Sequence, residues 1–193
     1  MRPLTSIELH LLLRPPCHSD RSSSLNNLAA ALQGRFDQKG VLTDLDEAID
    51  LHRAALALYP PCHSDRSTSL SNLATSLQDR FKQRGVLSHL DEAIDLHQAA
   101  LAIRPQGHSS RSLSLNNLAT TLQSRFDRMG VLSDLDEAID LHRAAHALHP
   151  PGHAFRSLSL DKLATSLRDR FKQRGALCDL DEAIDLHRAA LAL

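Results

Sequence analysis

Histidine is the residue of this chain with the most capacity for chemistry, because twelve occur among 193 residues. Adjacent Cys–His pairs, Cys17–His18 and Cys62–His63, resemble zinc ligands, but neighbouring residues rarely chelate one ion and a zinc site needs four converging groups. We therefore expect no metal and no cofactor. Four further histidines recur within a leucine- and alanine-rich pattern, and we interpret them as packed neutral imidazoles that bond a carbonyl or a neighbouring loop. They are His52, His97, His142 and His187.

Serine, histidine and aspartate are abundant, yet the motifs that activate them in enzymes are missing from the sequence. It contains no G-x-S-x-G, no H-E-x-x-H and no glycine-rich phosphate loop. Catalysis needs one unique site, whereas these residues recur in register along the chain. We therefore expect no catalytic residues and a protein that is not an enzyme.

Composition narrows the class of partner. The 22 basic and 23 acidic residues nearly cancel, whereas proteins that bind nucleic acid or membrane surfaces carry a basic excess. Three scattered cysteines are too few for a disulfide framework, and no stretch approaches the roughly 18 apolar residues of a membrane span. We expect a soluble, cytoplasmic protein that binds neither nucleic acid nor membrane.

An internal repeat predicts the helices that position the recurring histidines and the other polar residues. The segment LDEAIDLH begins at Leu45, Leu90, Leu135 and Leu180, always 45 residues apart. Residues 16–60 and 61–105 are identical at 33 of 45 positions. The sequence predicts a degenerate N-terminal capping helix over 1–15 and four repeats. The repeats span 16–60, 61–105, 106–150 and 151–193, the last truncated at its C-terminal end.

Each repeat has the apolar spacing of two amphipathic helices. One stripe predicts a first helix, helix A, over 20–38, and a second stripe predicts helix B over 44–58. Gly40 is placed to end helix A in a left-handed conformation, and Thr43 or Asp44 is placed to cap helix B. The first stripe is Leu25, Leu28, Ala29, Leu32 and Phe36, and the second is Leu45, Ala48, Ile49, His52, Ala55 and Leu56.

A single helical hairpin cannot bury its apolar stripe, but stacked copies can. The sequence therefore predicts an all-α, right-handed solenoid of stacked hairpins. The unit resembles the tetratricopeptide repeat, with a Leu–small pair in helix A (Leu28–Ala29), small residues in helix B (Ala48, Ala55) and a closing Pro60. The 45-residue period exceeds the usual 34. With its longer repeat, this array resembles those found in fungal proteins that often also carry CHAT or nucleotide-binding domains.

The resemblance implies a ligand-binding concave face formed by helix A. Asn27, Asn72 and Asn117 precede the Leu–Ala pair and resemble the asparagine ladder of some tetratricopeptide-repeat arrays. A carboxamide can both donate to and accept from a peptide backbone. The alternative is that these asparagines are ordinary polar residues of a helix surface. In the fourth repeat Lys162 occupies the position, and the expected neighbours on the same face are Asn26, Asn116, Gln33, Gln78 and Gln123.

We therefore expect a scaffold that binds a protein or peptide segment along helix A. A second hypothesis is a structural spacer or an oligomerisation element, because the last repeat ends without a polar cap and its open stripe could pair with another copy. A third is an accessory sensor region of a larger signalling protein.

One arginine recurs in every repeat, and it either packs its stem and bonds an acidic residue or anchors a ligand. Its copies are Arg35, Arg80, Arg125 and Arg170.

Overall fold

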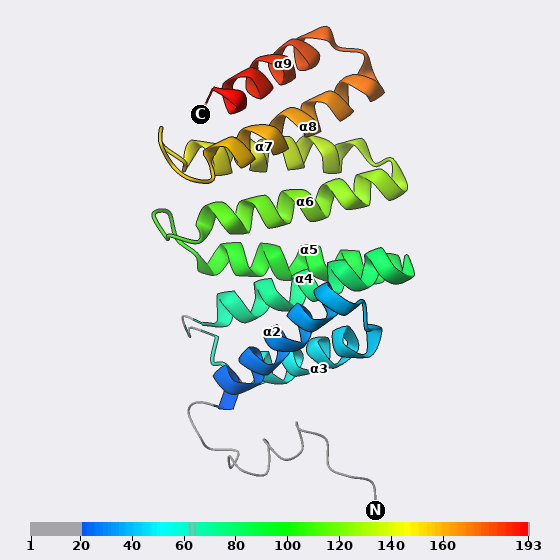
Figure 1. Cartoon of the computed structure of the whole chain (residues 1–193), viewed down its shortest axis with the longest axis vertical. Helices are drawn as coiled ribbons and strands as arrows, with labels where there is room; N and C mark the ends of the chain where they lie inside the picture. The colour runs from blue at the N-terminus through cyan, green and yellow to red at the C-terminus, as the bar shows by residue number, and fades with distance from the viewer. Residues whose placement is uncertain (1–20, 62, 64, 193) are drawn as a thin grey trace, which may run out of the picture.

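The computed structural model describes residues 21–61, 63 and 65–192. Their regular secondary structure is α-helical, and the helices pair into four stacked hairpins (Figure 1). This confirms the predicted all-α array. The first helices of the hairpins are α2 (Arg21–Lys39), α4 (Arg66–Arg84), α6 (Arg111–Met129) and α8 (Arg156–Arg174). The second helices are α3 (Leu42–Leu58), α5 (Leu87–Ile103), α7 (Leu132–Ala147) and α9 (Leu177–Leu191). The expected capping helix over 1–15 lies outside the described residues.

A glycine ends each first helix, as predicted. Gly85 has φ +68°, and its N–H donates to the carbonyl of Phe81 at 2.7 Å. Gly40 has φ +69° and makes the same bond to Phe36. Side chains other than glycine rarely adopt this left-handed conformation, so the glycine allows the short turn into the second helix.

The start of the second helix differs from the prediction. Helix α3 begins at Leu42, two residues earlier than expected, and its cap residue Val41 makes no side-chain cap bond. The expected cap residue Asp44 instead lies inside the first turn, where its N–H donates to the carbonyl of Val41 at 3.0 Å. Its carboxylate binds Arg35 of the preceding helix. The prediction that Thr43 or Asp44 caps this helix is therefore wrong, because the carboxylate pairs with a cation rather than with the helix end.

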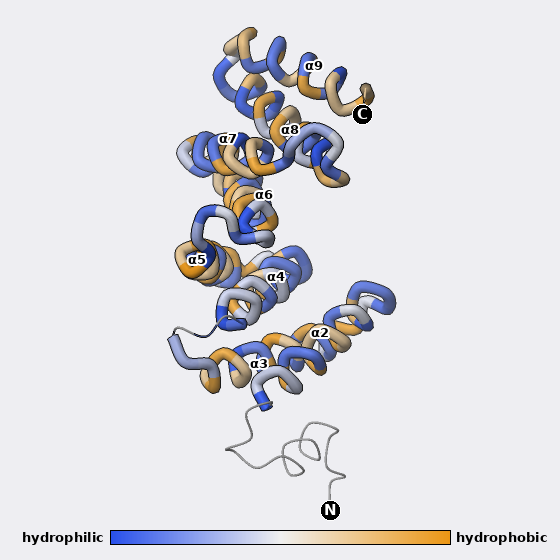
Figure 2. Tube along the Cα trace, turned by 90° about the vertical axis from the view of Figure 1, so that its left-hand side faces the viewer, coloured by the Kyte–Doolittle hydropathy of each residue, from blue (hydrophilic) through white to orange (hydrophobic). Residues whose placement is uncertain are grey.

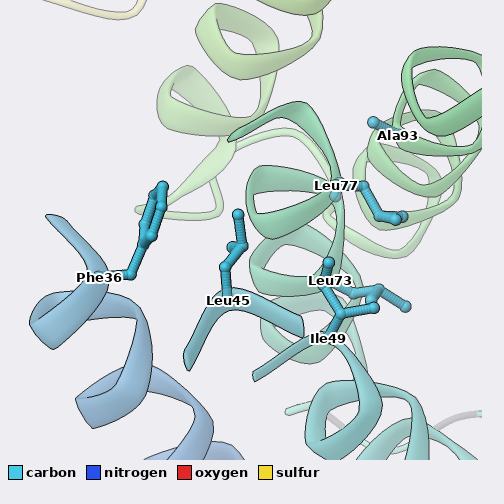
Figure 3. Packing of buried hydrophobic residues seen from close by; sticks show 7 residues of the cluster. Phe36, Leu45, Ile49, Leu73, Leu77 and Ala93 are labelled. Carbon is cyan, nitrogen blue, oxygen red and sulfur yellow. The ribbon is translucent and has the colours of Figure 1, made fainter. Parts of the chain in front are cut away.

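The core lies between hairpins as well as within them. Phe36, Leu45 and Ile49 of the first hairpin pack against the second one (Figure 3). The residues they contact there are Leu73, Ala74, Leu77 and Ala93. The third and fourth hairpins repeat this cluster with Phe126, Leu135, Ile139, Leu163, Ala164, Leu167 and Ala183. Identical residues thus bury identical surfaces, which is why stacking stabilises each copy.

The loops between hairpins are closed by an arginine at the start of each first helix. Arg66 donates to the carbonyl of Tyr59 at 2.9 Å, and Arg111 and Arg156 bond the carbonyls of Arg104 and His149 in the same way. The unpaired carbonyls at the C-terminus of a helix favour such a cation. The arginines therefore fix the approach of each hairpin to the next.

Candidate functional site

The first helices α2, α4 and α6 lie on one side of the stack, and the second helices α3, α5 and α7 lie on the other (Figure 2). We call the exposed side chains of α2, α4, α6 and α8 the helix A face. Asn27, Asn72, Asn117 and Lys162 occupy one register position on it. Each precedes a leucine of the apolar stripe, so its own side chain lies about 100° around the helix from that leucine. None of the three carboxamides forms a hydrogen bond within the described part of the chain, and they are exposed or half-buried.

The three glutamines predicted as neighbours instead join adjacent first helices. Gln33 of α2 donates from Nε2 to Asp79 of α4 at 2.9 Å and accepts from the hydroxyl of Ser76 at 2.9 Å. Gln123 of α6 makes the same pair of bonds to α8, at 3.0 Å each, and Gln78 of α4 donates to Ser124 of α6 at 3.3 Å. These amides hold the helix A face together, which leaves little of their bonding capacity for a ligand.

Asn26 and Asn116 also have partners inside the molecule. The Nδ1 atom of His52 lies 3.0 Å from Oδ1 of Asn26, and Nδ1 of His142 lies 2.9 Å from Oδ1 of Asn116. Because an amide oxygen only accepts, each imidazole donates from Nδ1. In the fourth hairpin Asp161 replaces the asparagine and lies 3.0 Å from His187. These bonds join the two helices of one hairpin. They agree with the interpretation of the histidines as packed imidazoles for His52 and His142, whereas His187 is 43% exposed and the ring nitrogens of His97 have no hydrogen-bond partner among the described residues.

Burial decides the charge state of the inner histidines. It lowers the pKa of His52, His97 and His142 to about 4, because a low-dielectric interior disfavours the imidazolium. His97 is also beside Arg104, which lowers its pKa further. The three rings are therefore neutral at neutral pH. No group of three or more His, Cys, Asp or Glu side chains among the described residues is arranged to hold a metal ion.

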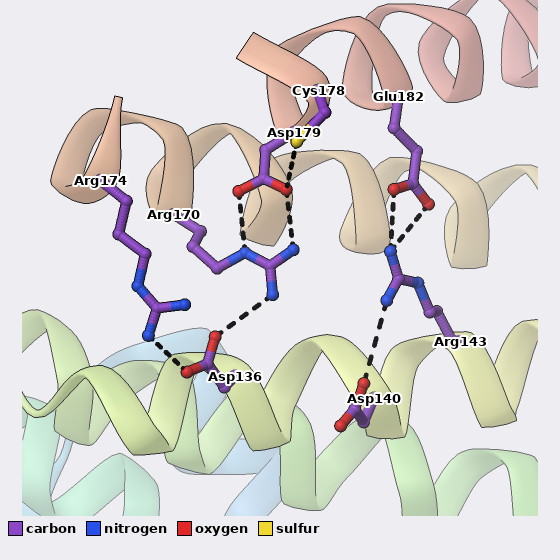
Figure 4. Close-up of polar contacts among 8 residues, drawn as sticks. All are labelled: Asp136, Asp140, Arg143, Arg170, Arg174, Cys178, Asp179 and Glu182. Carbon is purple, nitrogen blue, oxygen red and sulfur yellow. Dashed lines mark hydrogen bonds and ion pairs between the residues drawn. The ribbon is translucent and has the colours of Figure 1, made fainter. Parts of the chain in front are cut away.

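The recurring arginines bind acidic residues. Arg170 of α8 donates to both carboxylate oxygens of Asp179 at 2.7 and 2.8 Å, and also to Asp136 of the preceding hairpin at 3.2 Å (Figure 4). Arg125 makes the equivalent bonds to Asp134 and Asp91. Hydrogen bonds from Arg170 lower the pKa of Asp179. Of the two roles considered for this arginine, the structure therefore favours the structural one.

One hollow on the helix A face was missed by the sequence analysis. It has a volume of about 290 Å³ and lies between the N-terminal parts of α6 and α8. Leu113, Phe155 and Leu158 line it and are 58%, 61% and 52% exposed. The other lining residues used below are His149, His153 and Lys162. Such exposed apolar clusters are unusual unless they bind something.

The signal for this hollow is a break in the repeat. Leu113 and Leu158 stand where the first two repeats carry Ser23 and Thr68, and Phe155 stands where the second repeat carries Asp65. These three positions do not recur in register, so the repeat pattern does not contain them. Since repetition reports stacking, departures from it are the better guide to a unique site.

Lys162 connects this hollow with a second one of about 220 Å³, which His142, Asp161 and Thr165 also line. Its ammonium donates to the hydroxyl of Thr120 at 3.3 Å, and burial lowers its pKa. We find no ion pair for Lys162 among the described residues. A half-buried cation beside an apolar hollow can bind a ligand that combines an apolar side chain with a carboxylate.

None of the helices in the described segments is both long and apolar enough to cross a membrane. This finding concerns residues 21–192 with the gaps given above.

Comparison with known proteins supports the repeat assignment. A tetratricopeptide-repeat family model matches residues 21–58 and 66–106, which are the first two hairpins. The fold is similar to that of a Podosopora anserina protein, provisionally named a kinesin light chain, with nearly identical TPR-like repeats. The TM-score is 0.70 at 22% identity, over 96% of this chain and 82% of the other.

A second structure of that fungal protein, a single-substitution variant, gives a TM-score of 0.68 at 19% identity, over 97% of this chain and 84% of the other. No curated protein matches the sequence. At this identity the likeness concerns the fold alone. The chain is thus an all-α array of TPR-like repeats, a class that generally serves protein interactions.

Proposed function

We propose that this array is a protein-interaction module that binds an extended peptide segment along the helix A face. The observation that carries the proposal is the row of carboxamides at Asn27, Asn72 and Asn117, which recur every 45 residues without a hydrogen-bond partner among the described residues. Each can donate to and accept from a peptide backbone whatever its side chains. Lys162 continues the row in the fourth hairpin.

The apolar hollow beside Lys162 supports a preference in this binding. Leu113, Phe155 and Leu158 would take an apolar side chain of the peptide, and Lys162 would take a nearby carboxylate. The asparagines then hold the backbone, whereas the hollow selects the sequence. Buried aromatic and aliphatic anchors usually dominate the energy of such interfaces.

A peptide-display selection on the purified full chain tests the proposal. We expect extended peptides to enrich on the parent and to be lost on the triple variant Asn27→Ala, Asn72→Ala, Asn117→Ala. The matched control is Asp50→Ala, Asp95→Ala, Asp140→Ala, which changes three exposed residues of α3, α5 and α7 on the opposite side. Circular dichroism must show that all three proteins are folded. Equal enrichment on the asparagine variant would overturn the proposal.

We propose as a second function that the array associates with itself through its C-terminal hairpin. Ile184 of α9 is 40% exposed, whereas its equivalents in the first three hairpins, Ile49, Ile94 and Ile139, are 0–4% exposed. Phe171 is likewise more exposed than its three buried equivalents. Light scattering over a range of concentrations tests this function, and a mass that stays monomeric throughout would overturn it.

A further inference from the structure

The stack formed by the described residues begins with α2 and ends with α9, and these two helices carry the residues that form the two sides of every interior junction. At each junction the second helix of one hairpin packs against the first helix of the next, as α3 does against α4 (Figure 3). Helix α9 carries the residues of the first side, and α2 carries those of the second. Leu28 of α2 is half-buried, whereas its equivalents Leu73, Leu118 and Leu163 are almost fully buried.

We infer that a second copy of this chain stacks head to tail on the first, with its α2 against α9. This inference rests on the self-association proposed above and names its partner and polarity. The interior cluster of Phe36, Leu45 and Ile49 with the next hairpin has equivalents at the two ends of the described stack. On one copy these are Phe171, Leu180 and Ile184. On the other copy Leu28 offers the half-buried contact surface, whereas Ala29, Leu32 and Ala48 beneath it are already buried in their own hairpin.

Charges at the two ends are complementary in the same register. Arg53 binds Glu92 at 2.8 Å across the first junction. Arg143 binds Glu182 at 2.8 Å across the third junction (Figure 4). At the second junction Gln98 replaces the arginine that would face Glu137, and at the two ends Arg188 of α9 and Glu47 of α3 remain unpaired within this series. Within the part of the chain that the structure describes, the one ion pair of Arg188 is a 3.4 Å contact with the exposed Asp185 of its own helix. Head-to-tail stacking would give Arg188 the glutamate that its equivalents bind.

A second series of ion pairs, between an aspartate of one hairpin and basic residues of the next, also has matching partners at the two ends. Asp46 binds Arg80 and Arg84 of the next hairpin, and Asp136 binds Arg170 and Arg174. The equivalent pairing between two copies would join Asp181 of one to Arg35 and Lys39 of the other. Asp181 is exposed at the end of the stack, so it is free to make this contact.

Three side chains of the end repeats differ from their interior equivalents, and the larger one would face the two smaller ones. Gln123 of α6 contacts Ser166 and Asp169 of α8. At the junction between copies, Arg168 of one copy occupies the position of Gln123. Ala31 and Gly34 of the other copy occupy the positions of Ser166 and Asp169, and both are smaller. A Cβ atom added at Gly34 would meet nothing within 4 Å among the described residues. The departures therefore leave room for the larger arginine.

Because the two contacting surfaces differ, this interface is heterologous, and repeated stacking gives open chains rather than a closed dimer. We expect the mass of the full chain in light scattering to grow beyond that of a dimer as concentration rises. Ile184→Glu blocks the α9 end and Leu28→Glu blocks the α2 end. Each variant alone should be monomeric, and an equimolar mixture should form a 1:1 complex and nothing larger.

The variants separate this inference from the proposed self-association. If Leu28→Glu still dimerises alone while Ile184→Glu does not, two α9 ends pair with each other, and head-to-tail stacking is overturned although self-association stands. If the parent is monomeric at every concentration, both are overturned. Circular dichroism checks that each variant is folded.

A charge exchange tests the register without altering the apolar surface. Arg188→Glu or Glu47→Arg alone should weaken association roughly threefold, as expected for an exposed ion pair. The double variant carries the exchanged pair across the junction and should regain the parent affinity. A double variant weaker than both single variants would contradict the register proposed for the two copies.

Discussion

Asn26 and His52 form the hydrogen bond that joins the two helices of the first hairpin, with 3.0 Å between Oδ1 and Nδ1. The third hairpin repeats this bond, and the fourth keeps it with an aspartate. In the second hairpin Ser71 replaces the asparagine. Its hydroxyl and both ring nitrogens of His97 are buried without a hydrogen-bond partner among the described residues. The second hairpin therefore lacks a polar contact that the other three have.

Restoring this contact should stabilise the protein. We expect Ser71→Asn to raise the free energy of unfolding by about 1 kcal/mol, because it replaces a buried unpaired hydroxyl with a partner for His97. Urea unfolding followed by circular dichroism measures the change. Ser71→Ala is the control, since it removes the hydroxyl without supplying a partner and should change stability less. A destabilised Ser71→Asn would show that the second hairpin cannot adopt the geometry of the first.

The buried histidines should make stability depend on pH. Burial lowers the pKa of His52, His97 and His142 to about 4 from an unfolded value of 6.5. Between these values the unfolded chain binds more protons, so stability falls as pH drops below about 6.5. The loss amounts to about 2 kcal/mol per histidine at pH 5. We expect the melting temperature to be constant from pH 8 to 7 and to fall steeply towards pH 5.

The variant His97→Leu provides the control for the pH dependence. It removes one of the three imidazoles whose pKa is lowered to about 4 and should reduce their combined loss of stability between pH 7 and pH 5 by about a third. Acidic residues act in a different window, since Arg170 lowers the pKa of Asp179 and this carboxylate loses its contribution only in more acidic solution. A melting temperature unchanged from pH 8 to 5 would show that the rings titrate normally in the folded state.

Much of the fold follows from the sequence because repetition and packing reinforce each other. The residues of the LDEAIDLH segment that were placed in a buried stripe, such as Leu45, Ala48 and Ile49, are fully buried. Gly40 ends its helix in the left-handed conformation expected of it. The start of the second helix could not be predicted, because Asp44 has the side chain of a cap residue and its partner Arg35 is nine positions earlier in the sequence.

The candidate site was less predictable, for a physical reason. Asn26 and Asn27 are adjacent and chemically identical, yet one bonds His52 inside the hairpin and the other is exposed. A helical step of about 100° decides between these roles, and only the packed arrangement shows which residue points inward. The hollow around Phe155 depends on departures from the repeat, which a pattern built from recurring residues does not contain.

The second hairpin also lacks the buried aspartate that binds the recurring arginine elsewhere. His89 occupies the position of Asp44, Asp134 and Asp179, and burial together with Arg80 lowers its pKa. We expect His89→Asp to raise the free energy of unfolding by about 1 kcal/mol, since Arg80, which already pairs with Asp46, gains a second carboxylate partner. Chemical denaturation at pH 7 measures it.

The reverse change, Asp134→His, is the matched control for this pair. It removes the carboxylate that accepts from Arg125 at 2.7 and 2.9 Å and should lower the free energy of unfolding by about 2 kcal/mol. If both substitutions shifted stability in the same direction, the pairing of the arginine would not be the cause.

The helix A face should separate into residues that stabilise the stack and residues that are free to bind. Gln123 bonds both Ser166 and Asp169 of the next hairpin, whereas Asn117 makes no side-chain hydrogen bond within the described segments. We expect Gln123→Ala to lower the free energy of unfolding by about 1–2 kcal/mol and Asn117→Ala to change it by less than about 0.5 kcal/mol. Thermal and urea unfolding of the two single variants measure these effects. An Asn117→Ala variant as unstable as Gln123→Ala would show that the asparagine row is part of the scaffold, and peptide capture lost in that variant would then report unfolding rather than a missing ligand contact.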